Sequence, residues 1–140
     1  MKNINSIAII DDDYICQFTA KRIIEVAHIA KKIFLFSEGK EACDYLTANA
    51  GKTEKLPDII LLDIHMPIMD GFEFLKCFST LKFTFRKKID IHVFTSSVDL
   101  DDIARIKSFA DVTGCVGKPV TLTKLENIIS SFQRETIFYS

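Results

Sequence analysis

Five polar residues with complementary chemistry follow short apolar segments of this 140-residue chain: the carboxylates Asp11, Asp12 and Asp63, the hydroxyl of Thr95 and the ammonium group of Lys118. If the three carboxylates lie about 5 Å apart, each pair repels by roughly 1 to 3 kcal/mol, so the cluster favours a bound cation. Ligand atoms that are all oxygen, without a supporting histidine or cysteine, favour Mg²⁺. The lysine and the threonine could then bind the oxygens of a phosphoryl group. These residue types therefore indicate phosphoryl chemistry at a Mg²⁺ site.

Taken alone, each of these residues has an ordinary structural explanation. An aspartate after a strand often caps the next helix, as Asp11 or Asp13 could do here. Thr95 alone would be a turn residue, and Lys118, which precedes a proline, would be an exposed lysine. Their joint occurrence after separate apolar segments is what favours a functional site. Within the acidic run we expect Asp13 to begin a helix and the metal to bind Asp11 and Asp12.

The elements that must position these residues follow from the hydrophobic pattern. Continuously apolar segments are typical of strands covered on both faces of a parallel sheet, and they occur at residues 7–10, 33–36, 59–62, 91–94 and 115–116. Segments with helical spacing alternate with them, at residues 14–27, 38–48, 71–78, 99–109 and 123–138. Right-handed crossovers turn this order into an α/β fold, a doubly wound five-stranded parallel sheet with helices on both faces. Ligands of such sheets bind outside the carboxyl ends of the strands, where the five polar residues would meet.

Finer expectations concern single helices and connections. The first helix carries an apolar stripe that we expect to face the core: Ile15, Phe18, Ile23 and Val26. Ser37 is expected to cap the second helix. The polar connections at residues 49–55 and 82–88 are expected to be solvated loops rather than sites.

Size, charge and cysteine spacing limit the classes of protein. One domain is expected for 140 residues, with no output domain and a core at about residues 5–138. A net charge of −1 argues against a nucleic-acid partner, and no apolar stretch approaches membrane-spanning length. The N-terminus lacks a signal peptide, so we expect a cytoplasmic protein. Disulfide or metal roles are not expected for the scattered cysteines, Cys16, Cys43, Cys77 and Cys115.

Three motifs carry a resemblance to a known family. They are IIDD at residues 9–12, DIILLDIHMPIMDG at residues 58–71 and GKP at residues 117–119. Together they closely resemble the receiver domain of bacterial two-component response regulators, here of the single-domain type, and the resemblance covers almost the whole chain. It implies the flavodoxin-like strand order 2-1-3-4-5. It also implies transfer of a phosphoryl group from a phosphohistidine on a histidine kinase or a histidine phosphotransfer protein.

The resemblance assigns roles to residues by motif. Asp63 would be the phosphoacceptor, Asp12 a direct Mg²⁺ ligand and Asp11 a ligand partly through water. The backbone carbonyl of His65 would complete the protein ligands. Thr95 would be the switch hydroxyl. Lys118 would bind phosphate, and its bond to Pro119 would be cis.

Output is expected to run through the fourth helix, fifth strand and fifth helix, as the resemblance implies, to an unknown downstream protein. A homodimer through the same face is a further arrangement that it allows. Cys115 stands where the family usually has Tyr or Phe, so we expect the loop at residues 96–100 to carry the structural change. His65 stands where the family often has a small polar residue.

Two alternatives remain. A haloacid-dehalogenase-like phosphatase also uses a nucleophilic aspartate and Mg²⁺, but its D-x-D signature is replaced here by the adjacent Asp11, Asp12 and Asp13. A receiver-fold binding module that acts without phosphorylation would have no need for clustered, mutually repelling carboxylates. We therefore expect a phosphoacceptor domain rather than a turnover enzyme.

Overall fold

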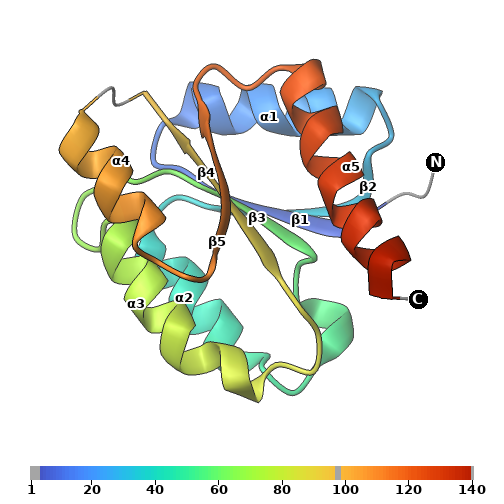
Figure 1. Cartoon of the computed structure of the whole chain (residues 1–140), viewed down its shortest axis with the longest axis horizontal. Coiled ribbons are helices and arrows are strands. Elements are labelled where there is room, and N and C mark those ends of the chain that lie inside the picture. The colour runs from blue at the N-terminus through green and yellow to red at the C-terminus, as the bar shows by residue number, and fades with distance from the viewer. Residues whose placement is uncertain (1–3, 97–98, 140) are drawn as a thin grey trace.

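The architecture is a single sheet between two helix layers (Figure 1). A computed structural model describes residues 4–96 and 99–139, with side chains described as far as residue 132. The strands are β1 (Ile4–Ile10), β2 (Ala30–Phe36), β3 (Ile59–Leu62), β4 (Asp90–Thr95) and β5 (Val112–Gly117). All the pairs are parallel and the order is β2-β1-β3-β4-β5. The predicted α/β fold with strand order 2-1-3-4-5 is therefore confirmed.

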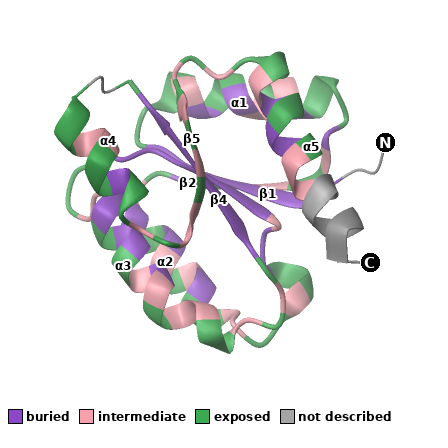
Figure 2. Ribbon diagram, in the orientation of Figure 1, coloured by how far each residue is buried: buried purple, intermediate pink, exposed green. Residues whose placement is uncertain are grey.

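The helices divide between the two faces of the sheet, and each face has its own apolar core. The helices are α1 (Tyr14–Val26), α2 (Gly39–Ala48), α3 (Gly71–Leu81), α4 (Leu100–Lys107) and α5 (Leu122–Tyr139). Helices α1 and α5 cover one face, where Ile24 and Leu125 pack with residues of β1 and β3. Helices α2, α3 and α4 cover the other, where Leu46, Phe74 and Ile106 pack together. The central strands are buried on both sides, as Figure 2 shows, which explains why they read as continuously apolar.

Strand register sets the position of the polar residues that follow the strands. Ile10 pairs with Leu62, so β1 and β3 end side by side. Leu62 pairs with Val93, which places Thr95 two residues further along β4. The carboxyl ends of the three central strands thus place Asp11, Asp63 and Thr95 at one edge of the sheet.

The face that α1 turns to the core differs from the predicted one. Its buried residues are Gln17, Ala20 and Ile24, whereas Ile15 and Phe18 are 74% and 55% exposed. Val26, also placed in the predicted stripe, is 64% exposed, and only Ile23 packs partly against the core. The prediction is wrong because a polar residue occupies the buried face. The amide of Gln17 donates to the carbonyl of Phe36 over 3.2 Å, so its burial leaves no unpaired donor there.

The start of α2 also differs from the prediction. The N-cap position is Glu38, which makes no side-chain capping hydrogen bond, so the expected cap by Ser37 is wrong. Instead the backbone N–H of Ser37 donates to the carboxylate of Glu41 over 3.2 Å. A side chain from within the helix thus reaches back to the residue before the cap.

A disulfide joins α2 to α3. Cys43 and Cys77 are bonded, with their Cα atoms 6.6 Å apart, while Cys16 and Cys115 are free. The expectation that no cysteine forms a disulfide is therefore wrong. The two residues are 34 positions apart, and helical spacing alone does not say which helices become neighbours. Both cysteines are half-buried at the contact between the two helices.

The two polar connections contain short 3₁₀ helices, η1 (Thr53–Lys55) and η2 (Lys82–Thr84). Over residues 4–96 and 99–139, none of the helices combines the length and the apolar character needed to cross a membrane.

Candidate functional site

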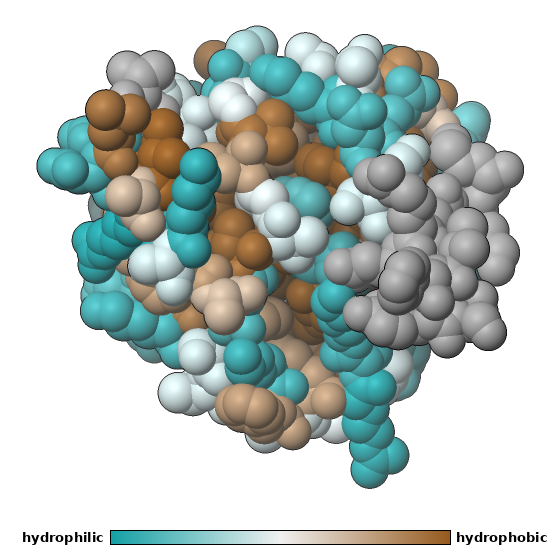
Figure 3. Space-filling model, viewed as in Figure 1, coloured by the Kyte–Doolittle hydropathy of each residue, from teal (hydrophilic) through white to brown (hydrophobic). Residues whose placement is uncertain are grey.

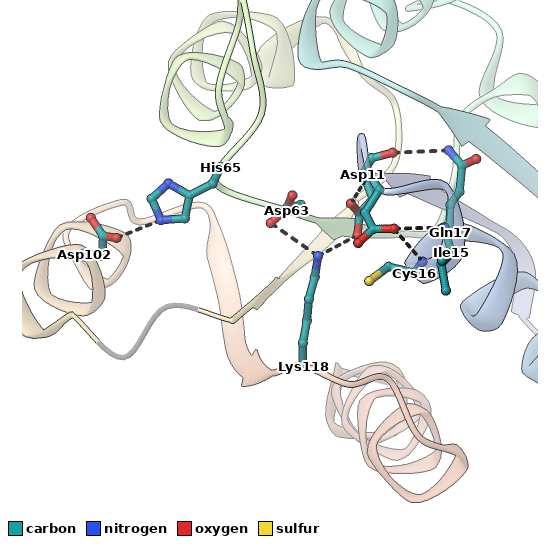
Figure 4. Close-up of polar contacts among 9 residues, drawn as sticks. Asp11, Ile15, Cys16, Gln17, Asp63, His65, Asp102 and Lys118 are labelled. Atoms are coloured by element: carbon teal, nitrogen blue, oxygen red, sulfur yellow. Dashed lines mark hydrogen bonds and ion pairs between the residues drawn. The ribbon is translucent and has the colours of Figure 1, made fainter.

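Three carboxylates converge at the carboxyl edge of the sheet (Figure 4). Asp11, Asp12 and Asp63 each offer an oxygen, and these oxygens lie within 4.8 Å of one another. Asp11 and Asp63 are buried, at 7% and 6% exposure, whereas Asp12 is exposed. The cluster is therefore open to solvent on the side of Asp12.

Backbone hydrogen bonds extend the sheet into the cluster. The N–H of Asp63 donates to the carbonyl of Ile10 over 2.9 Å, and the N–H of Asp11 donates to the carbonyl of Phe36 over 3.1 Å. Each aspartate is thus fixed by the strand next to its own. Rigid strand ends of this kind hold mutually repelling groups together better than a loop would.

Lys118 connects the cluster to the end of β5. Its ammonium nitrogen lies 2.9 Å from Asp11 Oδ2 and 3.6 Å from Asp63 Oδ1. Its backbone N–H donates to the carbonyl of Thr95 over 3.0 Å, which ties the turn after β5 to the end of β4. The bond between Lys118 and Pro119 is cis, which confirms that expectation.

Burial and neighbouring charges shift the protonation equilibria in this group. The pKa of Asp63 is raised to about 6, first by desolvation and then by the negative charge of Asp11, against the opposing effect of Lys118. Desolvation by itself would lower the pKa of Lys118. The hydrogen bond to Asp11 and the charges of Asp63 and Asp11 outweigh that effect, so the pKa lies above its ordinary value. The lysine is therefore charged at neutral pH, while Asp63 holds its proton more tightly than an exposed aspartate does.

The carboxylate of Asp13 does not belong to the cluster and caps the start of α1, although the backbone N–H of Asp13 donates to Asp11 Oδ1 over 2.9 Å. The Asp13 carboxylate accepts hydrogen bonds from the N–H groups of Ile15 and Cys16, at 2.9 and 3.3 Å. These bonds lower the pKa of Asp13. The expectation that Asp13 starts the first helix is confirmed.

We expect Mg²⁺ affinity to depend on Asp12 much more than on Asp13. Asp12→Ala removes one oxygen of the cluster, whereas Asp13→Ala removes a helix cap that supplies no oxygen to the cluster. The affinity is measured by Mg²⁺ titration of the two variants and the parent, with thermal melts to show the separate effect of the lost cap. Equal loss of Mg²⁺ affinity in the two variants would contradict this geometry.

The loop between β3 and α3 is held close against Asp63 by a glycine. A Cβ atom at Gly71 would lie 2.7 Å from the carbonyl oxygen of Asp63 and from the Cα of Ile64. Only glycine allows this approach without a backbone shift, and its N–H donates to the carbonyl of Ile64 over 2.8 Å. Gly71 is the first residue of α3, whose start is stabilised by a capping box between Asp70 and Glu73.

His65 makes a contact that the sequence did not indicate. Its ring Nε2 lies 2.9 Å from a carboxylate oxygen of Asp102, in the first turn of α4 (Figure 4). Its backbone hydrogen-bonds to the carboxylate of Asp63 and counteracts the rise in pKa there. An aspartate in the first turn of a helix is ordinarily explained by its interaction with the helix dipole. The sequence pattern therefore did not indicate that Asp102 contacts His65.

The remaining predicted residues lie near the edge of the sheet but outside the carboxylate cluster. Thr95 is buried at the end of β4, at 4% exposure. Cys115 is exposed on β5 and pairs in register with Val93. Of the loop predicted to carry the structural change, residues 97 and 98 lie outside the described residues.

The donor set suits a hard divalent cation. The three converging carboxylates supply oxygen atoms, one side chain faces solvent, and no thiol or imidazole belongs to the group. Mg²⁺ favours such an arrangement, since it retains several waters and takes few protein ligands.

Comparisons with known proteins agree with this geometry. A probable methanogenesis regulatory protein, FilR2 of Methanothrix harundinacea, is 29% identical over 128 residues, covering 91% of this chain and 80% of its own. A two-component response regulator from Cytophaga hutchinsonii is 28% identical with a TM-score of 0.84, covering 95% of this chain and 99% of its own. A receiver protein from Dyadobacter fermentans shares the fold, with a TM-score of 0.78 at 24% identity, covering 91% of this chain and 96% of its own. The response regulator receiver domain matches residues 7–130, and the chain belongs to that family.

Proposed function

We propose that this chain is a phosphoacceptor signalling domain in which Asp63 takes a phosphoryl group from a phosphohistidine and the phosphorylated surface is then read by another protein. The observation that carries the proposal is the convergence of three carboxylates within 4.8 Å with an ammonium group 2.9 and 3.6 Å from two of them. Repelling carboxylates held this closely are best explained by a cation and a phosphoryl group that bind between them.

The transfer is a substitution at phosphorus. An oxygen of Asp63 forms the new P–O bond, the bond from phosphorus to the histidine nitrogen breaks, and its electron pair stays on the imidazole, which takes up a proton. Mg²⁺ bound by Asp11, Asp12, Asp63 and the backbone carbonyl of His65 would supply charge stabilisation. Lys118 compensates negative charge on the phosphoryl oxygens, and Thr95 donates a hydrogen bond to one of them.

The partners follow from this chemistry and from the family. Members receive phosphoryl groups from histidine kinases, and a histidine kinase or a histidine phosphotransfer protein is the proposed donor. The downstream protein would bind the face formed by α4, β5 and α5, through which a homodimer could also form. Cytoplasmic location is part of the proposal, since that is where receiver domains usually act.

The test is phosphorylation of the purified chain by acetyl phosphate and Mg²⁺, followed by mass measurement. We expect one added phosphoryl group in the parent and none in Asp63→Asn, because the amide has no ionisable oxygen to act as the nucleophile. Asp58→Asn is the matched control, since Asp58 is ion-paired to Lys87 and lies immediately before β3 rather than after it. Retention of the added mass in Asp63→Asn would contradict the assignment of Asp63 as the phosphoacceptor.

The same samples separate the alternatives. Steady turnover of p-nitrophenyl phosphate by the parent would favour a phosphatase of the haloacid dehalogenase class. Partner binding that is equal in the parent and in Asp63→Asn would favour a binding module that needs no phosphorylation.

A further inference from the structure

The end of the sheet opposite to the carboxylate cluster carries a hollow of about 510 Å³. It lies between the segment that follows α3 and the turn that precedes β5, and its lining includes Phe78, Lys82, Phe83, Phe85, Lys88 and Asp111. The expectation that residues 82–88 form only a solvated loop does not account for this hollow. In Figure 3 hydrophilic and hydrophobic side chains are interleaved over the end of α3 and the segment after it, in the lower part of the view.

A second hollow, of about 470 Å³, adjoins the first. Its lining includes Lys31, Lys32 and Leu56, and Lys87 lines both hollows. We call the two hollows and their linings the lysine face. A ligand that filled both hollows would be an extended chain that crosses Lys87, since one compact small molecule could not occupy both.

The lysine face is positively charged, although the chain as a whole has a net charge of −1. Five lysines line the two hollows, at positions 31, 32, 82, 87 and 88, and they outnumber the acidic residues that line the hollows or pair with these lysines, which are Glu54, Asp58, Asp90 and Asp111. Lys82 is held by Asp111 at 2.7 Å and Lys87 by Asp58 at 2.8 Å. An ammonium group has three N–H donors, so each of these paired lysines can donate to a further acceptor. The ion pairs also fix the positions of the two ammonium groups.

Aromatic rings supply the apolar part of the first hollow. The Phe78 and Phe85 rings pack with centroids 5.7 Å apart, and the neighbouring Phe83 is 83% exposed. The ammonium group of Lys82 lies 5.1 Å from the centre of the Phe83 ring. An exposed phenylalanine beside fixed cations suits a partner that brings both an apolar side chain and negative charges.

We propose that the lysine face binds an extended, acidic segment of a partner protein, with an aromatic or aliphatic side chain in the first hollow and carboxylates along Lys87 and Lys88. A membrane surface fits less well because the face is concave. A nucleic acid fits less well because Asp58, Asp111 and Glu54 lie among the cations and would repel phosphates. The site is at the amino-terminal edge of the strands, so it can be occupied independently of the chemistry at Asp63.

The probe is a labelled synthetic peptide, EDFESELDES, whose binding is followed by fluorescence polarisation and amide NMR shifts. We expect a dissociation constant between about 1 µM and a few hundred µM that rises as salt is added. Amide shifts should occur at residues 31–32, 53–56, 82–89 and 110–113, which line the two hollows, and not at Asp63. Lys88→Glu and Phe83→Ser should each weaken binding by about fivefold or more, since one reverses a charge and the other removes the exposed ring. Lys76→Glu is the matched control, because Lys76 is exposed on α3 but lines neither hollow, and its affinity should stay within about twofold of the parent.

Several results would overturn the proposal. One is binding of the charge-reversed peptide KKFKSKLKKS, or of the peptide EDSESESDES without apolar side chains, as tightly as the probe. Another is a loss of affinity in Lys76→Glu as large as the loss in Lys88→Glu. A third is the absence of amide shifts at the lysine face at peptide concentrations up to about 1 mM. Tighter binding of a ten-nucleotide single-stranded DNA or of phosphatidylserine vesicles than of the peptide would assign the face to those ligands instead. Thermal melts of each variant verify that it is folded. This check matters most for Lys88→Glu, because Lys88 lies 4.0 Å from the carboxylate of the buried Asp90.

Discussion

Reducing the disulfide between Cys43 and Cys77 is expected to lower the free energy of unfolding by about 3 to 4 kcal/mol, the chain-entropy value for a loop closed by residues 34 positions apart. The bond stabilises the fold because it restricts the unfolded chain, and it also holds α2 against α3. Urea unfolding with and without dithiothreitol measures the difference. A loss of this size is a large fraction of the stability of an ordinary domain.

Matched variants distinguish the bond from the reductant. Cys43→Ala and Cys77→Ala should unfold at similar urea concentrations with or without dithiothreitol, close to the reduced parent. Cys16→Ala and Cys115→Ala should retain the full effect of reduction, since both residues are free thiols. Four reactive thiols in the unfolded, unreduced parent would show that the bond does not form in solution.

The Asp63→Asn variant is expected to be more stable than the parent at pH 8 without Mg²⁺, by up to about 3 kcal/mol. The folded-state pKa of Asp63 is raised to about 6 from an ordinary value of 3.8. Below about pH 4 the carboxyl is protonated in both states and has no effect on stability. Between about pH 4 and about pH 6 the unfolded parent releases this proton while the folded parent retains it, so the free energy of unfolding of the parent falls as pH rises. Above about pH 6 the loss is complete. Its size is roughly 1.4 kcal/mol for each pH unit between the two pKa values.

The measurement is urea unfolding of the two proteins from pH 4 to pH 8 in the presence of a chelator. The stability difference should be near zero at pH 4 and reach its full size by pH 7. Added Mg²⁺ should narrow the difference at pH 8, because it binds the parent's carboxylates in the folded state. Asp13→Asn is the control, since asparagine also caps a helix and the residue is outside the cluster. A difference that does not change with pH would show that burial does not raise the pKa of Asp63.

Strand patterning and motif spacing predicted the fold and the convergence of Asp11, Asp12 and Asp63. The strands are continuously apolar because both of their faces are buried, and this pattern can be recognised within a single short stretch of sequence. The carboxyl ends of parallel strands must share an edge, so Asp11 and Asp63 could be placed together without knowing any helix contact. The cluster was predictable because it depends on strand order alone.

The features that were missed depend on which helices adjoin and which side chains satisfy buried polar groups. The predicted apolar stripe of α1 failed because Gln17 finds acceptors at the strand ends, which makes a polar residue acceptable in the core. The Cys43–Cys77 bond and the His65–Asp102 pair join separate elements across distances that periodicity does not encode. Each of these interactions depends on the packing angle of a helix on the sheet.

The two edges of the sheet differ in their resistance to pairing with a strand of another molecule. β2 carries exposed Lys31 and Lys32, whose charges oppose the close approach of a second such edge. β5 has no charged side chain, and its exposed positions are Thr113, Cys115 and Gly117. Its protection depends on an irregularity in its register with β4, between Ile91 and His92, which disturbs the flat ladder that an added strand would need. Intermolecular association of the folded chain through strand addition would therefore begin at β5 rather than at β2.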